Sequence, residues 1–312
     1  MHYLQKMNKK NLILGLAILI SSCNQNQLTN NSKQDNIADT ESKISSYPLE
    51  KLASGFKWAE GPAVDKEGNV YFTDVRQSLI LIWTIDNKLD TFQVNSYGTN
   101  GLYFDKDNNL LACVMRKRQV TSTSPLGEVK VIASTYKGVQ FNEPNGLWSD
   151  KKGGVFFTDP KYGKNDKDLS QDGMHVYYIS PDRSSITRVI EDFEKPNGLI
   201  GTEDGKTLYV TDAQAGKTYR YDIQEDGSLK NKKLFVASGC DGMTIDKKGN
   251  VYLSTNGKQA VDIFSSLGVL LQSIPVPERV ANMCFGGKDK NQLYITGQSS
   301  LYRVKVQVEE IN

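Results

Sequence analysis

Short runs in which apolar and polar residues alternate follow one another along most of the chain. Val70–Thr73 (VYFT) is a typical run, and the polar turn DKEGN at residues 65–69 comes just before it. Alternation with a period of two is typical of half-buried β-strands, whereas helices repeat their apolar positions every three to four residues. Almost no helical periodicity is present. The pattern therefore predicts an all-β protein.

One phrase, made of an apolar strand, a turn and a second strand, recurs along the chain. It begins at Glu60 (EGPAVDKEGNVYFTD), and later copies begin at intervals of 40, 45, 52, 44 and 41 residues, at Asn100, Asn145, Asn197, Asp241 and Asn282. Two further apolar stretches follow, LILIWTID and LDTFQV in the first copy. Four short strands per roughly 40 to 50 residues are typical of a propeller blade. The repeats predict a six-bladed β-propeller of four-stranded antiparallel blades over residues 47–312.

The sixth repeat has only three strands before the sequence ends. Residues 47–55 (YPLEKLASG) precede the first repeat and have no partner of their own. We expect them to supply the missing outer strand and so to close the ring, because an open ring of five blades plus a separate piece would leave unpaired backbone donors at both ends. The longest interval contains a polar insertion, residues 161–173, which is predicted to be a loop after the second strand of the third blade.

The first 46 residues predict a targeting segment followed by a linker. Three lysines precede the apolar run Leu12–Ile20, which would span roughly 14 Å, about half of a bilayer core. The run ends in ISSC, which resembles a bacterial lipobox. Residues 1–22 are therefore predicted to be a lipoprotein signal peptide, with Cys23 lipidated and the protein anchored in the bacterial cell envelope, in the periplasm or outer membrane. A plain signal peptide and an uncleaved anchor are the alternatives. Residues 23–46 have few hydrophobic side chains and predict a disordered tether.

The net charge limits which binding partners are expected, and the cysteines are expected to have a structural role. The formal net charge is only +2, which excludes a strongly basic nucleic-acid surface. Contact with a membrane is expected only through the N-terminal lipid, and the oligomeric state stays open. The remaining cysteines, Cys113, Cys240 and Cys284, are expected to be small buried hydrophobic residues, with a Cys240–Cys284 disulfide as the alternative.

The first residues of the six repeats share one chemistry. In a propeller the first strand of each blade lines the central channel, so these side chains form a ring around the axis. Every member is a carboxylate or a carboxamide. Oxygen ligands of this kind suit a hard cation such as Ca²⁺, whereas zinc prefers His or Cys. The alternative is that Asn and Asp before Gly occupy ordinary turns or caps.

A second set of polar residues ends the second strands, where Thr-Asp pairs include Asp74, Asp159 and Asp212. These aspartates either orient ligands and substrate or cap strand ends by hydrogen bonds. Asp159 is the best candidate for a functional role, because it opens the long loop of the third blade. His175 could lie at the mouth of the channel, but a hydrogen-bonded structural role is expected.

Several motifs together resemble the senescence marker protein, gluconolactonase and luciferin-regenerating enzyme family of six-bladed propellers. The resemblance covers residues 47–306, and its landmarks are EGP at Glu60, PNG at Asn145, FTDPKYG at residues 157–163, KPNGL around Asn197, DGMTID at Asp241 and CFGG at Cys284. It implies a catalytic divalent ion, commonly calcium although other divalent cations are possible. Its ligands would be Glu60, Asn145, Asn197 and Asp241.

The resemblance implies a metal-dependent hydrolase that opens a small sugar lactone with metal-activated water. Asp241 is the preferred general base, and Asn100, Asp159 and Tyr162 are expected to meet substrate hydroxyls. A hydrolase of aryl esters or phosphotriesters and a noncatalytic propeller lipoprotein with a structural ion are the alternatives. The chain departs from the family at Gln140, where many members have Arg, at Lys161, often Pro, and at Val114 and Met115, where Glu and His are frequent. These departures weaken the sugar-lactone assignment more than the metal site.

Overall fold

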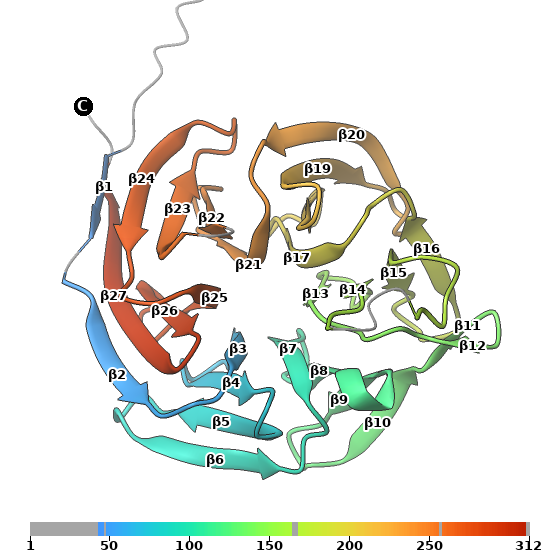
Figure 1. The fold of residues 1–312 in the computed structure, drawn as a ribbon, viewed down its shortest axis with the longest axis horizontal. Coiled ribbons are helices and arrows are strands. Elements are labelled where there is room, and N and C mark those ends of the chain that lie inside the picture. The colour runs from blue at the N-terminus through green and yellow to red at the C-terminus, as the bar shows by residue number, and fades with distance from the viewer. Residues whose placement is uncertain (1–42, 47, 164–167, 256–257, 310–312) are drawn as a thin grey trace, which may run out of the picture. The chain divides into compact units, whose positions relative to one another are not determined.

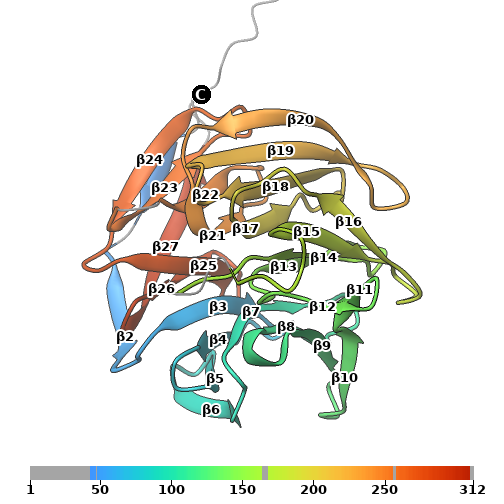
Figure 2. The same ribbon diagram turned by 45° about the vertical axis from the view of Figure 1, so that its right-hand side comes forward.

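Six β-sheets are arranged in a ring around a common axis (Figure 1). The structure is a computed structural model, and it describes residues 43–46, 48–163, 168–255 and 258–309. Each sheet is antiparallel and has its first strand nearest the axis, and in blades 1 to 5 the last strand lies on the rim (Figures 1 and 2). The predicted six-bladed propeller of four-stranded blades is confirmed.

The first three blades follow the predicted repeats. Blade 1 consists of β3 (Ala59–Val64), β4 (Val70–Asp74), β5 (Leu79–Trp83) and β6 (Leu89–Val94). Blade 2 consists of β7 (Thr99–Phe104), β8 (Leu110–Val114), β9 (Gln119–Thr123) and β10 (Val129–Ala133). Blade 3 consists of β13 (Leu147–Ser149), β14 (Val155–Asp159), β15 (His175–Ile179) and β16 (Ile186–Ile190).

The other three blades repeat this order. Blade 4 consists of β17 (Pro196–Gly201), β18 (Thr207–Asp212), β19 (Lys217–Ile223) and β20 (Leu229–Val236). Blade 5 consists of β21 (Cys240–Ile245), β22 (Val251–Thr255), β23 (Ala260–Phe264) and β24 (Leu270–Pro275). Blade 6 contains β25 (Val280–Gly286), β26 (Gln292–Gly297) and β27 (Ser300–Glu309).

The outer strand of blade 6 comes from the start of the propeller, as predicted. β2 (Glu50–Ser54) pairs antiparallel with β27, and Glu50 lies opposite Arg303. The long β27 also pairs with β1 (Lys43–Ser46), with Lys43 opposite Glu309. β1 lies inside the range 23–46 that the sequence assigned to the tether, so that prediction is corrected for these four residues: the extended β27 offers them backbone partners. The signal peptide, Cys23 and the rest of the tether lie outside the described residues.

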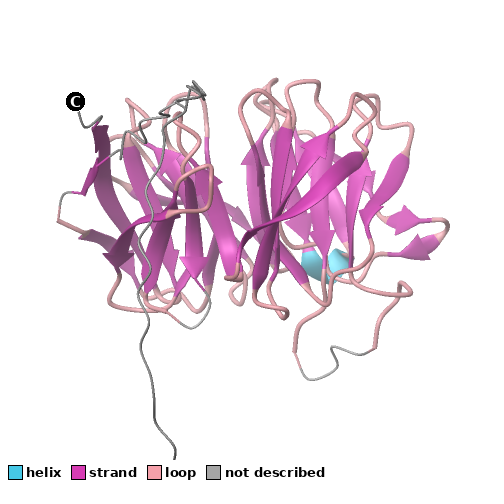
Figure 3. Cartoon of the chain, turned by 90° about the horizontal axis from the view of Figure 1, so that it is seen from above, coloured by secondary structure: helices cyan, strands magenta, loops and turns pink. Residues whose placement is uncertain are grey.

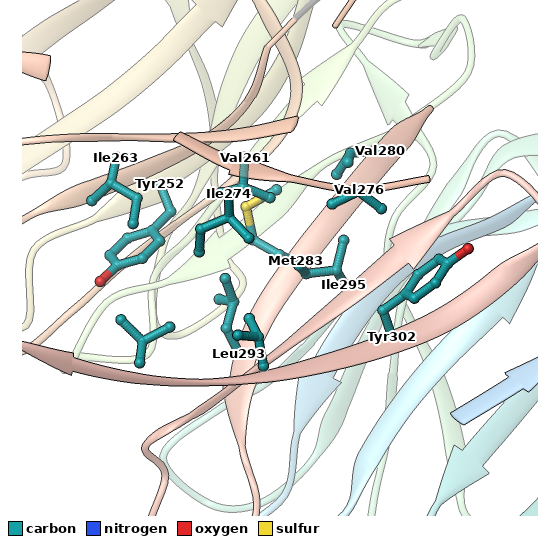
Figure 4. Packing of buried hydrophobic residues seen from close by; sticks show 12 residues of the cluster. Tyr252, Val261, Ile263, Ile274, Val276, Val280, Met283, Leu293, Ile295 and Tyr302 are labelled. Atoms are coloured by element: carbon teal, nitrogen blue, oxygen red, sulfur yellow. The ribbon is translucent and has the colours of Figure 1, made fainter. Parts of the chain in front are cut away.

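The hydrophobic core is divided among the interfaces between neighbouring blades. Six clusters of buried side chains each join two adjacent blades, and the cluster of blades 6 and 1, around Tyr294 and Phe72, completes the circle. Figure 4 shows the cluster of blades 5 and 6, where Val261 and Ile274 lie near Met283 and Ile295. Each blade is therefore stabilised by its two neighbours, because burial of these side chains removes apolar surface from water.

Other elements are small. A 3-10 turn, η1 (Met115–Lys117), follows β8, and β11 (Thr135–Tyr136) pairs with β12 (Val139–Gln140) between blades 2 and 3. In the part of the chain that the structure describes, no helix has the length and apolarity needed to cross a membrane. Loops join the strands at the two ends of the ring (Figure 3), and the predicted loop of blade 3 connects β14 to β15.

The three cysteines of the propeller are buried and free. Cys240 packs in the cluster between blades 4 and 5, whereas Cys284 packs in the cluster between blades 6 and 1. The alternative of a Cys240–Cys284 disulfide is therefore wrong, and the prediction of small buried hydrophobic residues is confirmed for these positions.

Candidate functional site at the axial end of the inner strands

The inner strands pair irregularly with their neighbours at the ring residues, which are the first residues of the six repeats. In blade 1 the register with β4 shifts between Glu60 and Ala63, and corresponding shifts occur in the inner strands of blades 2, 4, 5 and 6. In blade 3, Asn145 and Gly146 directly precede the short strand β13. A bulge frees residues from the ladder and re-aims their side chains. The irregularities therefore let these polar side chains turn toward the axis instead of into a blade interface.

A glycine follows five of the six ring residues because the inner strands approach one another closely. A Cβ added to Gly101 would stand 2.4 Å from the carbonyl oxygen of Asn145, and one added to Gly198 would stand 2.7 Å from that of Asp241. The Gly101 N–H in fact donates to the Asn145 carbonyl at 2.9 Å. The Asn-Gly and Asp-Gly pairs are thus neither ordinary turns nor caps. They bring each ring residue beside the ring residue of the next blade.

Three of the predicted metal ligands, Asn145, Asn197 and Asp241, line one cavity of about 620 Å³ along the axis. Its other end reaches the turns that carry Lys151 and Lys247. This volume lies within the usual range of small-molecule pockets. The fourth predicted ligand, Glu60, is only 3% exposed and precedes Gly61, which lines the same cavity.

Glu60 and Asp241 are buried carboxyl groups that affect each other's ionisation. Burial and, next, the charge of Asp241 raise the pKa of Glu60 to about 8, against hydrogen bonds from the Gly61 N–H and the Trp58 and Asn282 side chains. Burial also raises the pKa of Asp241, which is opposed by the charge of Arg279 and a hydrogen bond from Asn197. Two buried carboxylates facing one another are costly unless a positive charge compensates them. The pair therefore favours a cation between them.

The amide side chains of the ring extend this polar site. Asn197 Nδ2 donates to Asp241 Oδ1 and to Tyr162 Oη, each at 2.7 Å. Tyr162 is 37% exposed and comes from the blade 3 loop, so this loop reaches the ring. Asn100 Nδ2 lies 3.6 Å from Met115 Sδ. Of the predicted substrate contacts, Asn100 is thus one of the six ring residues, and Tyr162 is bonded to another of them, Asn197.

Asp159, the third predicted substrate contact, lies at the end of β14. Its side chain is fully buried, and its Oδ2 accepts the N–H of Asn142 at 2.8 Å. Asp74 and Asp212 likewise accept N–H groups of the segment that precedes their own inner strand, from Lys57 and Glu194. Asp159 thus accepts a backbone N–H as the other two do, and it is not one of the described residues that line the axial cavity. Contact between Asp159 and substrate stays a prediction.

His175 has the expected structural role. Its Nε2 lies 3.0 Å from Asp172 Oδ1, and Asp172 is also paired with Arg188 on the outer strand of the blade. His175 is 5% exposed and stands opposite Asp159 in the β14–β15 pair. The imidazole is thus part of the blade 3 sheet and its loop.

Two important neighbours of the site were missed in the sequence. Arg279 Nη2 lies 3.1 Å from Asp241 Oδ2, and its guanidinium stacks on the ring of Trp58 at 5.3 Å. Trp58 in turn bonds to Glu60. Both residues precede an inner strand and fall outside the repeated phrase. Their position just before a ring residue is the signal that could have found them.

The site fits a divalent cation only if amide oxygens take part. Among the described residues no group of three or more His, Cys, Asp or Glu side chains is placed to hold a metal. The set of Glu60, Asp241, Asn145 and Asn197 contains two carboxylates and two carboxamides, and hard cations such as Ca²⁺ accept both. The raised pKa of Glu60, caused by burial and next by the charge of Asp241, favours such an ion.

The family model described as SMP-30/Gluconolactonase/LRE-like region matches residues 58–299. The chain belongs to this family. It is 29% identical over 296 residues to the gluconolactonase of Zymomonas mobilis, covering 83% of this chain and 82% of that protein. It is 30% identical over 235 residues to lactonase drp35 of Staphylococcus saprophyticus, covering 70% of each.

Solved structures have the same fold. A gluconolactonase from Xanthomonas campestris is 28% identical and superposes with a TM-score of 0.76 over 83% of this chain and 89% of its own. Regucalcin from Agrobacterium tumefaciens, a calcium-binding protein, is 16% identical, with a TM-score of 0.71 over 85% of this chain and 96% of its own. The second likeness shows the fold alone. The resemblance seen in the sequence motifs is therefore confirmed.

Proposed function

We propose that this protein is a metal-dependent hydrolase that opens a sugar lactone. The observation that carries the proposal is the pair of carboxyl groups Glu60 and Asp241: Asp241 lines the axial cavity with Asn145 and Asn197, and the charge of Asp241 acts on the buried Glu60. The relatives named gluconolactonase and lactonase support the substrate class. Together they favour hydrolysis of an internal ester over a purely structural role for the ring.

The ion would be Ca²⁺ or another divalent cation, held by Glu60, Asn145, Asn197 and Asp241. When bound it supplies Lewis-acid polarisation of a carbonyl oxygen. Lactone opening adds the oxygen of a water molecule to the carbonyl carbon and breaks the bond from that carbon to the ring oxygen. One proton of the water passes to the departing ring oxygen, so that the product is a hydroxy acid.

The chain's own residues hold the reactants and move this proton. Asp241 is the proposed general base: its carboxylate lies at the end of the cavity and is 13% exposed. Asn197 fixes Asp241 Oδ1 and the Tyr162 hydroxyl through one amide nitrogen, so both are oriented before substrate arrives. Tyr162 and Asn100 are the proposed contacts of the lactone hydroxyls. Such prior orientation lowers the entropic cost of reaching the reactive geometry.

The test is an assay of acid release from D-glucono-1,5-lactone with a pH indicator, corrected for spontaneous hydrolysis. We expect activity that a chelator removes and Ca²⁺ restores. Asp241→Asn should lower kcat/KM by about 10²- to 10⁴-fold, with an unchanged circular dichroism spectrum. The control Asp226→Asn removes an exposed turn carboxylate and should leave the rate unchanged.

Activity that survives Asp241→Asn would contradict the assignment of the base. Faster turnover of aryl esters or phosphotriesters than of any lactone would move the protein to the related ester-hydrolysing class. Absence of turnover on all of them, with retained Ca²⁺ binding, would indicate a noncatalytic propeller.

We also propose that the mature protein is anchored in the bacterial cell envelope by a lipid on Cys23. The support is the lysine-rich start, the apolar run and the ISSC sequence. In cells, Cys23→Ser should shift the protein from the membrane fraction to the soluble fraction without changing lactonase activity. A protein that stays with the membrane after this substitution would contradict the proposal.

A further inference from the structure

Arg279 brings a positive charge directly to the candidate site. It lies in the segment between β24 and β25, and its Nη2 is 3.1 Å from Asp241 Oδ2. The neighbouring Glu278 fixes this segment, because its Oε2 accepts the Ser299 N–H at 2.6 Å and its Oε1 accepts the Tyr302 hydroxyl at 2.7 Å. The Arg279 side chain itself is 52% exposed. It is thus held at the site and open to a ligand.

A second arginine lies close to the first. The guanidinium of Arg76 stacks on the ring of Trp58 at 4.9 Å, and that of Arg279 stacks on the same ring at 5.3 Å. The two guanidinium groups are therefore at most about 10 Å apart. Arg76 follows β4 in blade 1, whereas Arg279 precedes the inner strand of blade 6. Trp58 thus contacts both guanidinium groups.

A divalent ion held by Glu60 and Asp241 would change the charge balance around Arg279 and Arg76. Glu60 and Asp241 carry two negative charges at most, and a divalent ion between them would neutralise both. Arg279 would then lose Asp241 as its counter-ion, while Arg76 is still within about 10 Å. Two partly exposed guanidinium groups with planar donor forks bind a carboxylate or a phosphate with two parallel hydrogen bonds. An anion supplied by the substrate would restore the balance of charge.

The blade 2 side of the ring, which adjoins blade 1, places apolar side chains beside Asn100. There Asn100 contacts the thioether of Met115, and Val114 is buried. Neither Met nor Val donates a hydrogen bond to a sugar hydroxyl or an anion. The two arginines that stack on Trp58 come from the segment after β4 of blade 1 and from the segment before β25 of blade 6.

We propose that the substrate is an anionic lactone, whose carboxylate or phosphate substituent binds Arg279 and Arg76 beside the reacting ester. This inference rests on the proposed lactonase function and specifies its substrate class. Arg279 and Arg76 act in recognition, and Trp58 positions them.

Matched pairs of lactones test the proposal. D-Glucaro-1,4-lactone and D-glucono-1,4-lactone differ only in a carboxylate against a hydroxymethyl group, and 6-phospho-D-glucono-1,5-lactone and its unphosphorylated form provide the phosphate arm. We expect the anionic member of at least one pair to have the higher kcat/KM, and the better pair identifies the anion. Arg279→Gln should reduce that preference by about 10- to 100-fold, the usual effect of losing a hydrogen bond to a charged group. Arg76→Gln should reduce it in the same direction.

Arg183→Gln is the matched control. It removes the same charge from the turn between β15 and β16, where Arg183 Nη1 bonds the Gly153 carbonyl, and it should leave the preference unchanged. Equal kcat/KM for the charged and neutral members of both pairs would overturn the proposal. So would an Arg279→Gln variant that lowers both members of a pair by the same factor, because that result assigns Arg279 to Asp241 alone.

Calorimetry supplies a readout that does not depend on turnover. Wild type loaded with Ca²⁺ should bind D-glucarate about 10-fold or more tightly than D-gluconate, and Arg279→Gln should abolish the difference. Metal-free protein, prepared with a chelator, gives a second comparison. Metal-free Asp241→Asn should bind glucarate more tightly than metal-free wild type, because the substitution releases Arg279 from Asp241. If no lactone is hydrolysed, the lactonase proposal fails, and these titrations still decide whether the anion site exists. Equal affinities for glucarate and gluconate in wild type would overturn it.

Discussion

Replacement of Asp159 by asparagine is expected to change how stability depends on pH. The carboxyl group is fully buried. Burial is the main cause that raises its pKa from 3.8 to about 7, against the N–H groups of Asn142 and Glu143 that lower it. Its Oδ2 accepts the Asn142 N–H, whereas its Oδ1 has no partner among the described residues. Ionisation in the folded protein therefore leaves part of the charge uncompensated.

The sign and size follow from the two pKa values. Because the folded-state pKa is raised, the folded protein binds the proton more strongly than the unfolded chain. The stabilisation is fully present below about pH 4 and is lost as the pH rises to about 7. One pKa unit corresponds to about 1.4 kcal/mol, so this group alone should remove about 3 kcal/mol of unfolding free energy between about pH 5 and about pH 8. Asparagine cannot ionise and contributes no such loss.

The assay is urea unfolding of wild type and Asp159→Asn at about pH 5 and about pH 8, in the presence of chelator. Other titrating groups are common to both proteins, so the difference between the two profiles isolates Asp159. Asp74→Asn is the matched control, because Asp74 has the corresponding place in blade 1 and both of its oxygens accept hydrogen bonds. Parallel pH profiles of wild type and Asp159→Asn would refute the reasoning.

Three further predictions follow from the ring and the core. Gly101→Ala should destabilise the protein by about 1–3 kcal/mol in urea unfolding, and by more than Gly146→Ala. The added Cβ would stand 2.4 Å from a carbonyl oxygen at position 101 and 3.0 Å from one at position 146. An equal effect of the two substitutions would contradict the packing argument. Ca²⁺ at about 100 times its dissociation constant should stabilise chelated protein by about 2.7 kcal/mol, and Glu60→Gln should remove most of that gain; full stabilisation of the variant would exclude Glu60 as a ligand. In native protein the three buried cysteines should resist a thiol reagent and all should react after denaturation; a change of melting temperature on reduction would contradict the free-thiol assignment.

The fold and most of the ring could be predicted because they repeat. Six copies of one phrase fix the blade count, and a residue at one place in the phrase must lie at one height around the axis. The sequence thus predicted that Asn145, Asn197 and Asp241 meet, and all three line the same cavity. The reason for the glycine after five of the six ring residues was hidden, since the clash it avoids is with the neighbouring blade.

Residues that do not repeat could not be placed in this way. Arg279 and Trp58 belong to connecting segments of different blades, and only the closed ring brings them within stacking distance. Asp159 has a hydrogen bond that the sequence did not reveal. Its place before a long loop suggested a functional role, and the structure shows that its carboxylate accepts a backbone N–H, as the corresponding aspartates of blades 1 and 4 do. β1 was missed because a polar segment shows no strand pattern until a partner is present.

The pairing of β2 with β27 has a consequence for the kinetics of folding. Glu50 and Arg303, which bond across this pair, are 253 positions apart in the chain. Contacts of such separation form slowly, because a large loop must be closed before they contribute. During synthesis the first blade has to wait for the last one to leave the ribosome before it gains its second neighbour. Until the ring closes, two blade faces are exposed and available for aggregation or for a chaperone.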